Sequence, residues 1–433
     1  MAGDRFGQTT FAQLITEGAL EIGDGYRAKN EELGGDGLLF LRAGHVTDTH
    51  IDFEGVERFH VDLKSRVRSK LAKPGDAVIT TKGNSTGRTT FVSSSMPPFV
   101  YSPHLSYWRS LDPNRIEGGF LRYWCRGSEF TTQLAGMKAS TDMAPYLSLV
   151  DQKRLEITLP PVHEQRAIGH ILGSLDDKIE LNRRMNETLE AMARALFKSW
   201  FVDFDPVRAK TKGRDPVPKP LADLFPDSLE DSELGEIPIG WKIGSIYTAA
   251  EVIYGAPFSS TKFNSDGVGK PLIRIRDLVD ESPGVFTVEE HPKGYLVKPG
   301  DIVVGMDGEF RSYLWGGVDS WLNQRVCVFK PRIGFSSSFV LHSIVGLLAG
   351  VEATETATTV IHLGKNDIDR FKIVVPTEPI LTAFGQLAEP LFHRIVVSKQ
   401  ESRTLVSLRD TLLPKLISGE FRVKDAERIV GLV

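Results

Sequence analysis

One stretch, residues 159–204, constrains the fold of this chain more than any other feature. After a Pro-Pro pair and an acidic first turn, apolar side chains recur at helical spacing: Ile168, Ile171, Leu172, Leu175, Ile179, Leu189, Met192, Leu196 and Trp200. Between Glu164 and Phe201 there is no proline, and the poorest helix formers are Gly169 and Gly173. At 1.5 Å per residue the pattern predicts a helix on the order of 55 Å long. Because this far exceeds the usual three turns, we expect a spacer as well as a core element.

The same stretch occurs a second time, 216 residues further along the chain. Asp151 and Arg154 are matched by Asp367 and Arg370 (367 − 151 = 216), and the register continues without a gap through residues 377–420. The apolar positions are kept: Ile168 with Phe384, Ile171 with Leu387, Leu175 with Leu391, Ile179 with Ile395, Leu189 with Leu405, Met192 with Leu408, and Leu196 with Leu412. Since the surface positions vary while the apolar ones persist, the pattern indicates a duplicated helix with one core-facing side.

The segments before each helix also resemble each other. Lys73-Pro74-Gly75-Asp76 is matched by Lys298-Pro299-Gly300-Asp301, and each run precedes a short apolar segment that is typical of a buried strand. We therefore predict an α+β fold with a pseudo-two-fold internal repeat. In it, two mixed α/β globular domains are separated by two long antiparallel helices that form a coiled coil. Polar residues interrupt the apolar seam at equivalent places and are expected to set its register: Asn182 and Asn186, then Ser398 and Ser402.

This organisation predicts six segments. They are a first globular domain (1–158), a central helix (159–204), a proline-rich linker (205–240), a second globular domain (241–376), a C-terminal helix (377–420) and a tail (421–433). The proline density of the linker predicts an extended tether without helix or sheet. The tail is expected to fray.

Composition narrows the class of protein. The chain has 52 Lys and Arg against 56 Asp and Glu, a formal charge of −4. This argues against a free-standing, strongly basic nucleic-acid-binding protein but permits local DNA contacts within a complex. Two cysteines, Cys125 and Cys327, cannot build a disulfide framework or a zinc cluster, which fits a reducing cytoplasm. The start lacks the features of a signal peptide, and no apolar run is long enough for a membrane span, so we expect a cytoplasmic location.

Basic residues gather in residues 58–88, where eight Lys and Arg stand against two Asp. This run indicates a phosphate-facing surface, with a solvated basic face as the alternative. The loop at residues 80–88 carries small hydrogen-bonding side chains, and the corresponding loop at 305–312 keeps the framework with different chemistry. Two domains that read different DNA sequences would differ in this way, although variable surface loops are the alternative. The candidate DNA-binding residues are Arg66, Arg68, Lys82, Asn84, Ser85, Thr86, Arg88, Arg274, Arg276 and Arg311.

Motifs for catalysis are missing from the sequence. Residues 96–99 resemble the Asn-Pro-Pro-aromatic motif of amino-methyltransferases, but Met96 stands where the Asn would hold the target amino group. The chain has no Gly-x-x-x-x-Gly-Lys-Ser/Thr loop for a nucleotide, and its ten His residues show no metal-ligand spacing. We therefore predict neither a catalytic residue nor a metal ligand.

The central motifs resemble the specificity subunits of type I restriction–modification systems. The resemblance rests on four runs: Leu159 to Ile168 (LPPVHEQRAI), Leu172 to Ile179, Leu196 to Phe201, and Phe225 to Trp241. The second copy departs from this signature, with Pro376-Thr377-Glu378-Pro379 at the start of its helix.

The resemblance implies a non-catalytic DNA-reading subunit. Each globular domain would be a target recognition domain for one half of a bipartite, asymmetric site in double-stranded DNA. The helices would space the domains and dock two adenine-methyltransferase subunits, and motor-nuclease restriction subunits would join them. S-adenosylmethionine, ATP and Mg would belong to those partners and not to this chain. The candidate docking residues are Glu164, Gln165, Leu175, Ile179, Leu196, Leu391, Ile395 and Leu412. The alternative is a structural adaptor that bridges two proteins without DNA, whereas a single-chain methyltransferase is disfavoured by the missing motifs.

Overall fold

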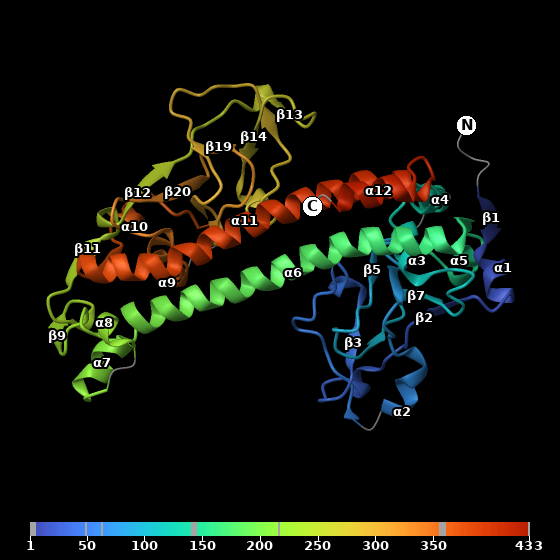
Figure 1. Ribbon diagram of the computed structural model, residues 1–433, viewed down its shortest axis with the longest axis horizontal. Helices are drawn as coiled ribbons and strands as arrows, with labels where there is room; N and C mark the ends of the chain where they lie inside the picture. Colours follow the sequence, from blue (N-terminus) through green and yellow to red (C-terminus); the bar gives the residue numbers. More distant parts are fainter. Residues whose placement is uncertain are drawn as a thin grey trace. The chain divides into compact units, whose positions relative to one another are not determined.

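The computed structural model describes residues 6–47, 50–61, 64–139, 145–214, 217–354 and 361–431 (Figure 1). Internal contacts divide the chain into two compact units. Unit 1 comprises residues 1–178 with 405–433, and unit 2 comprises residues 179–404. Each unit holds one globular domain and a part of each long helix, so the division falls inside the helices and not at the predicted domain ends. No helix among the described residues is long and apolar enough to cross a membrane.

The globular domain of unit 1 is built on a four-stranded antiparallel sheet. Its strands are ordered β2 (Leu20–Asp24), β7 (Leu105–Ser110), β4 (Ala77–Thr80) and β5 (Thr89–Phe91). β3 (Leu39–Leu41) and β6 (Phe99–Tyr101) form a parallel pair, and β1 (Gly7–Thr10) pairs with β8 (Glu156–Leu159). The helices are α1 (Phe11–Thr16), α2 (Lys64–Val67), α3 (Gly118–Trp124), α4 (Ser128–Ala139) and α5 (Leu149–Lys153). The core is centred on packed aromatic rings: Phe11, Trp108, Trp124 and Phe130.

The globular domain of unit 2 repeats this topology. Its four-stranded sheet is ordered β12 (Ala250–Tyr254), β20 (Val326–Pro331), β17 (Ile302–Gly305) and β18 (Ser312–Leu314). A second sheet is ordered β13 (Phe263–Asn264), β15 (Phe286–Thr287), β14 (Lys270–Ile273), β19 (Ser320–Leu322) and β16 (Leu296–Val297), and it contains the parallel pair β14–β19. β11 (Lys242–Ser245) pairs with β21 (Lys372–Val375), and the helices are α9 (Ser337–Thr354) and α10 (Lys365–Ile368). The four-stranded sheets, the parallel pairs β3–β6 and β14–β19, and the pairs β1–β8 and β11–β21 correspond, so the predicted repeat extends to these parts of the globular domains. The second sheet differs, with five strands in unit 2 and two in the described part of unit 1.

Two helices of 40 residues, α6 (Val162–Phe201) and α11 (Glu378–Ile417), match the duplicated stretch (Figure 1). In unit 2 they run antiparallel, because Asn182 of α6 contacts Ser402 whereas Trp200, further along α6, contacts Phe384. In unit 1 the same helices meet where Asp176 contacts Arg409. At 1.5 Å per residue each is about 60 Å long. The predicted long helices and their antiparallel pairing are confirmed.

The Lys-Pro-Gly-Asp runs form matching turns before β4 and β17. Gly75 and Gly300 adopt φ of +94° and +97°, a conformation that costs glycine little. Each aspartate closes its turn by accepting the backbone N–H of the lysine three residues earlier, at 2.9 Å for Asp76 and 2.8 Å for Asp301. The turn chemistry explains why this motif recurs in both copies.

The prediction of an extended linker at 205–240 is wrong. The segment forms α7 (Asp205–Thr211), α8 (Lys219–Ala222) and a hairpin of β9 (Leu229–Ser232) and β10 (Gly235–Pro238). Prolines lie in the first turns of α7 and α8, where a missing N–H costs nothing. Apolar residues between the prolines, such as Val207 and Phe225, are buried. Asp215 and Pro216 lie outside the described residues.

The tail also needs correction. It is not frayed throughout, since α12 (Val423–Val430) forms there and buries Ala426 completely.

The segment after β7 differs between the two units. In unit 1 it is divided into α3 and α4 around Cys125 to Gly127. The corresponding segment of unit 2 is the continuous helix α9.

Candidate nucleic-acid interface

The loop between β4 and β5 is held by its own backbone and hydroxyl groups. Gly83 and Gly87 have φ of +85° and +88°. The Thr86 hydroxyl is buried and donates to the carbonyls of Gly83 (2.7 Å) and Pro145 (3.0 Å), and the Thr80 hydroxyl donates to the Ser85 carbonyl. Thr86 therefore braces the loop, while Ser85 is half-buried. The side chains of Lys82 and Asn84 are exposed.

A second segment pairs with this loop through backbone hydrogen bonds. The N–H of Gly83 donates to the Pro145 carbonyl (3.1 Å), and the N–H of Leu147 donates to the Thr81 carbonyl (2.9 Å). Lys82 and Tyr146 consequently lie opposite each other in an antiparallel bridge. A third segment joins here, because the Thr81 N–H donates to the carbonyl of His104 (2.9 Å), whose side chain is exposed. Lys82, His104 and Tyr146 thus form a surface group from three separate segments, which we call the unit 1 triad.

Unit 2 has the same backbone frame with different side chains. Gly308 N–H donates to the Ile361 carbonyl (3.1 Å), and Leu363 N–H donates to the Met306 carbonyl (2.8 Å). Asp307 and His362 therefore occupy the bridge, and the Met306 N–H donates to the carbonyl of Arg325 (2.9 Å). We call Asp307, Arg325 and His362 the unit 2 triad.

The side chains of the unit 2 triad contact one another. The Asp307 carboxylate lies 2.6 Å from Nδ1 of His362 and 3.3 Å from Nη1 of Arg325. About half of each cationic side chain stays exposed, 48% for His362 and 54% for Arg325. Such a group can both accept and donate hydrogen bonds at the surface.

The predicted arginines of unit 1 are placed unequally. Arg66 pairs with Glu32 at 3.0 Å, and the pKa of Glu32 is lowered because its carboxylate accepts the Lys29 N–H, is hydrogen-bonded by Tyr26 and lies beside Arg66. Arg68 is exposed and has no ion pair among the described residues. Arg88 is half-buried and donates to the Val46 carbonyl at 3.1 Å, so it ties two loops together.

The local charge of residues 58–88 is smaller than the sequence count indicated. Lys70 pairs with Asp24 at 2.6 Å, as Arg66 does with Glu32. Both acids lie outside the run, which is why counting within it missed them. A basic surface remains, but folding neutralises part of it.

The predicted arginines of unit 2 are likewise not equivalent. Arg274 makes two hydrogen bonds to Asp277, at 3.0 and 3.2 Å, and so braces its own turn. Arg276 is exposed and has no ion pair among the residues that the structure describes. Arg311 is exposed and bound to Glu309 at 2.6 Å.

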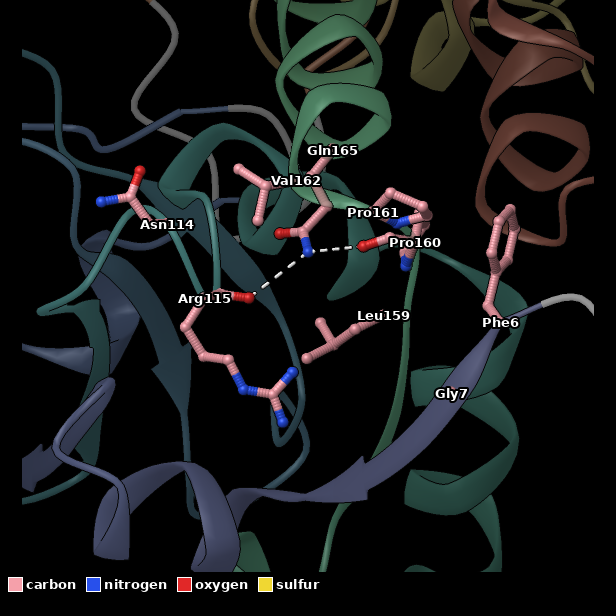
Figure 2. Close-up of a pocket in the computed structure, with 9 residues that line it drawn as sticks. All are labelled: Phe6, Gly7, Asn114, Arg115, Leu159, Pro160, Pro161, Val162 and Gln165. Atoms are coloured by element: carbon pink, nitrogen blue, oxygen red, sulfur yellow. Dashed lines mark hydrogen bonds between the residues drawn. The ribbon is translucent and has the colours of Figure 1, made fainter.

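The docking residues proposed on the helices lie mostly inside the chain. Gln165 is 1% exposed; its amide donates to the carbonyls of Pro160 (2.8 Å) and Arg115 (3.4 Å) and accepts the N–H of Glu117 (2.9 Å), as Figure 2 shows in part. It lines a cavity of about 340 Å³ at the start of α6, together with Phe6 and Leu159 (Figure 2). Gln165 of the Glu-Gln pair therefore fastens the helix start to the domain.

The apolar docking residues share this interior position. Leu175, Ile395 and Leu412 are at most 3% exposed, and Ile179, Leu196 and Leu391 are half-buried. The buried Leu175, Ile395 and Leu412 are not available for docking, because the periodicity that selected them marks the face that packs inside the chain. Docking at the half-buried Ile179, Leu196 and Leu391 stays a prediction. Glu164 is half-buried at the helix start. The apolar side chains exposed on the two helices are others: Leu181, Met192 and Leu387. Met192 had been expected in the seam.

No group of three or more His, Cys, Asp or Glu in the described part of the chain could hold a metal ion. The triads are therefore surface groups of hydrogen-bonding side chains on matched backbone frames. Of the predicted residues only Lys82 belongs to one of them. His104, Tyr146, Asp307, Arg325 and His362 were missed.

The comparisons with known proteins agree on one family. A family model described as "Type I restriction modification DNA specificity domain" matches residues 49–191. The type I restriction enzyme HindI specificity subunit of Haemophilus influenzae is 25% identical, over 88% of this chain and 94% of that relative. The type I restriction enzyme MjaIX specificity subunit of Methanocaldococcus jannaschii is 28% identical over 63% of this chain and 62% of that relative, less than two thirds of its length.

The fold agrees with a solved structure. The crystal structure of the type I restriction–modification system S subunit from M. genitalium matches with a TM-score of 0.58 at 15% identity, over 95% of this chain and 96% of that one. This likeness concerns the fold alone. Together with the sequence matches, it leads to one conclusion: the chain is similar to type I restriction–modification specificity subunits in sequence and shares its fold with one of them.

Proposed function

We propose that this chain is the DNA sequence-recognition subunit of a type I restriction–modification complex, in which each globular domain reads one half of a bipartite target. The observation that carries the proposal is the pair of triads. Three separate segments meet on the same backbone frame in both units, yet their exposed side chains differ completely. A scaffold that is duplicated while its surface group is changed suits two readers of different sequences.

The chemistry of each triad suits contacts with base edges and phosphates. Lys82, His104 and Tyr146 offer hydrogen-bond donors and an aromatic ring, and Lys is a frequent partner of guanine and of phosphate. In unit 2, Asp307 can accept from the amino group of cytosine, and Arg325 can donate to guanine. We expect the two domains to prefer different bases for this reason.

In this proposal the chain contributes recognition and no catalysis. Two adenine-methyltransferase subunits would supply S-adenosylmethionine chemistry, and restriction subunits would supply ATP- and Mg-dependent translocation and cleavage, in the cytoplasm. The exposed apolar residues of α6 and α11 are candidates for contacts with those subunits. The bridging adaptor without DNA has no support from the relatives, whose names all describe specificity subunits.

Methylome sequencing tests the proposal. The chain and its modification subunits are expressed in a host without other adenine methylation, and the methylated motif is read. Replacing Lys82 and His104 by alanine should relax only one half of the motif, and replacing Asp307 and Arg325 should relax only the other. Each lost base contact should cost about 1–3 kcal/mol of discrimination.

A matched control uses Lys212→Ala, an exposed lysine at the end of α7 that should leave the motif unchanged. If both double variants keep the complete motif, the triads do not read DNA. If no adenine methylation depends on the chain at all, the proposed function itself is wrong.

A further inference from the structure

In unit 1 a buried ionic cluster joins α6, α11 and the globular domain. The Asp176 carboxylate of α6 is 9% exposed and lies 2.7 Å from Arg122 and 2.7 Å from Arg409 of α11. It also accepts a hydrogen bond from the Tyr123 hydroxyl at 2.8 Å and lies 3.5 Å from Arg126. Burial by itself would raise the pKa of Asp176, but the arginines and the hydroxyl outweigh it and hold the pKa below its usual value. The carboxylate is therefore charged and depends on its partners.

The equivalent contact in unit 2 is apolar. The repeat offset of 216 carries Asp176 to Phe392 and Arg409 to Ala193, which are 4% and 0% exposed and belong to one apolar cluster. The offset of 219 carries Arg122 to Leu341 and Tyr123 to His342. Leu341 packs on that cluster, and the ring of His342 lies 5.8 Å from that of Phe392. The same positions meet in both units, with ionic chemistry in one and apolar chemistry in the other.

This difference decides which helices can pair. If α6 met the α6 of a second copy in the same register, Asp176 would face Ala193 and lose Arg409. If α11 met a second α11, Arg409 would face Phe392. In the α6 pair Asp176 would keep Arg122, Arg126 and Tyr123 but lose its contact across the helices, and in the α11 pair Arg409 would keep, of its described partners, only the exposed Asp410. Losing a partner from a buried ionic cluster is destabilising, because the charge stays out of water with fewer compensating contacts.

The polar centre of the helix pair also differs between the possible partners. Asn182 donates to the Ser402 hydroxyl at 3.3 Å and to the Glu401 carboxylate at 2.9 Å, and the equivalents of these two residues in α6 are Asn186 and Met185. Two α6 helices would bring asparagine to asparagine, a pairing that paired helices tolerate, but would lose the Glu401 acceptor. The contacts at Asp176 and at Phe392 are those where an ionic position in one unit is apolar in the other.

We propose that Asp176–Arg409 and Phe392–Ala193 form a pairing code by which α6 accepts α11 and rejects the α6 of a second copy. This pairing code concerns the assembly of the subunit and is separate from DNA recognition. It keeps one first and one second globular domain in each assembly, and so prevents assemblies with two identical domains.

The test uses the complete chain, cut once after folding. A protease site is inserted at Gly213, in the exposed turn after α7, and cleavage leaves two associated fragments. Two batches that carry different tags on the first fragment are mixed at equilibrium, and one tag is captured. The wild type should yield only complexes of a first with a second fragment.

A relocation variant combines Ala193→Arg with Arg409→Ala. Between α6 and α11 this variant mismatches both contacts, because Asp176 would face an alanine and Phe392 would face an arginine. Two α6 helices would instead gain two aspartate–arginine contacts. Two α11 helices would pair Phe392 with alanine. The ratio of like to unlike fragment pairs should rise by about 100-fold or more, the factor that corresponds to a lost partner of a buried charge. Ala193→Arg alone is the control, since it creates the mismatch without removing Arg409.

Two results would overturn the proposal. One is a wild type in which like and unlike fragments pair at random, and the other is a relocation variant that still pairs only unlike fragments. If the relocation variant does not fold, a double-mutant cycle between Asp176→Ala and Arg409→Ala on the uncut chain decides. Additive effects of those two substitutions on the unfolding equilibrium would show that the contact carries no pairing energy.

Discussion

Replacing Asp76 by alanine should cost far more stability than replacing its counterpart Asp301. Asp76 is fully buried and binds Nε and Nη2 of Arg109 at 2.6 and 2.7 Å and the Tyr101 hydroxyl at 2.8 Å, in addition to closing its turn. Breaking a buried ion pair from one side costs about 3–5 kcal/mol. The Asp301 carboxylate has only the Lys298 N–H and the Tyr295 hydroxyl as hydrogen-bond partners among the described residues. Two such bonds are worth about 1–3 kcal/mol.

Differential scanning calorimetry of the whole chain can measure the difference. At about 2–4 °C per kcal/mol for a body of this size, Asp76→Ala should lower the melting temperature of unit 1 by about 6–20 °C. Asp301→Ala should lower that of unit 2 by less. Because replacing both ionic partners by apolar residues is often nearly neutral, Asp76→Leu with Arg109→Met should recover part of the loss. The reasoning fails if Asp76→Ala costs no more than Asp301→Ala.

Three further predictions concern other sites. Burial lowers the pKa of His342 in the folded state. The stabilisation from the neutral His342 side chain is therefore complete above the unfolded-state pKa of about 6.5 and is lost as the pH falls below it. Chemical denaturation between pH 7.5 and 5 should show this loss in the wild type and not in His342→Phe. Gly25→Ala and Gly255→Ala should each destabilise their unit by about 1–3 kcal/mol or more, because the added Cβ would lie 2.0 Å from a backbone oxygen of Ser102 or Asn323, whereas Gly44→Ala has open space and should be neutral in the same melting assay. The third prediction is measured by titrating the assembled complex with DNA at several salt concentrations. If Arg276 contacts a phosphate, Arg276→Ala should weaken binding and reduce the slope of log affinity against log salt concentration by about 1. Arg274→Ala should act mainly on stability because Arg274 braces Asp277, and equal slopes for the two variants would contradict this assignment.

The long helices and the repeat could be predicted because their signals are local and periodic. The register of 216 residues between residues 159–204 and 377–420 has no gap, and both helices appear with 40 residues. The Pro-Gly turns were recognisable for the same reason. Proline density was a poorer guide, since prolines in the first turns of α7 and α8 are compatible with helices that bury Val207.

Contacts between distant segments could not be predicted from local patterns. Helical periodicity could not reveal whether an apolar face packs inside the chain or binds a partner subunit. For that reason the buried Leu175 and Ile395 were assigned to partner docking. Likewise, the acids that pair with Arg66 and Lys70 lie outside the basic run. The triads are formed by backbone bridges over long separations, so nothing near Lys82 indicated Tyr146. Only the two repeat offsets together, 225 for Lys82 with Asp307 and 216 for Tyr146 with His362, would have indicated them.

The backbone bridges beneath the triads have a consequence for how new targets can arise. The frame is fixed by N–H and carbonyl groups, such as Leu147 to Thr81 and Leu363 to Met306, and not by the side chains that it presents. Substitutions at Lys82, Tyr146, Asp307 and His362 therefore leave the hydrogen bonds of the scaffold in place, and both units already tolerate unlike residues there. A combinatorial library at these four positions should keep its folded fraction high while its sequence preferences diversify, so selection can act on specificity with little loss of stability.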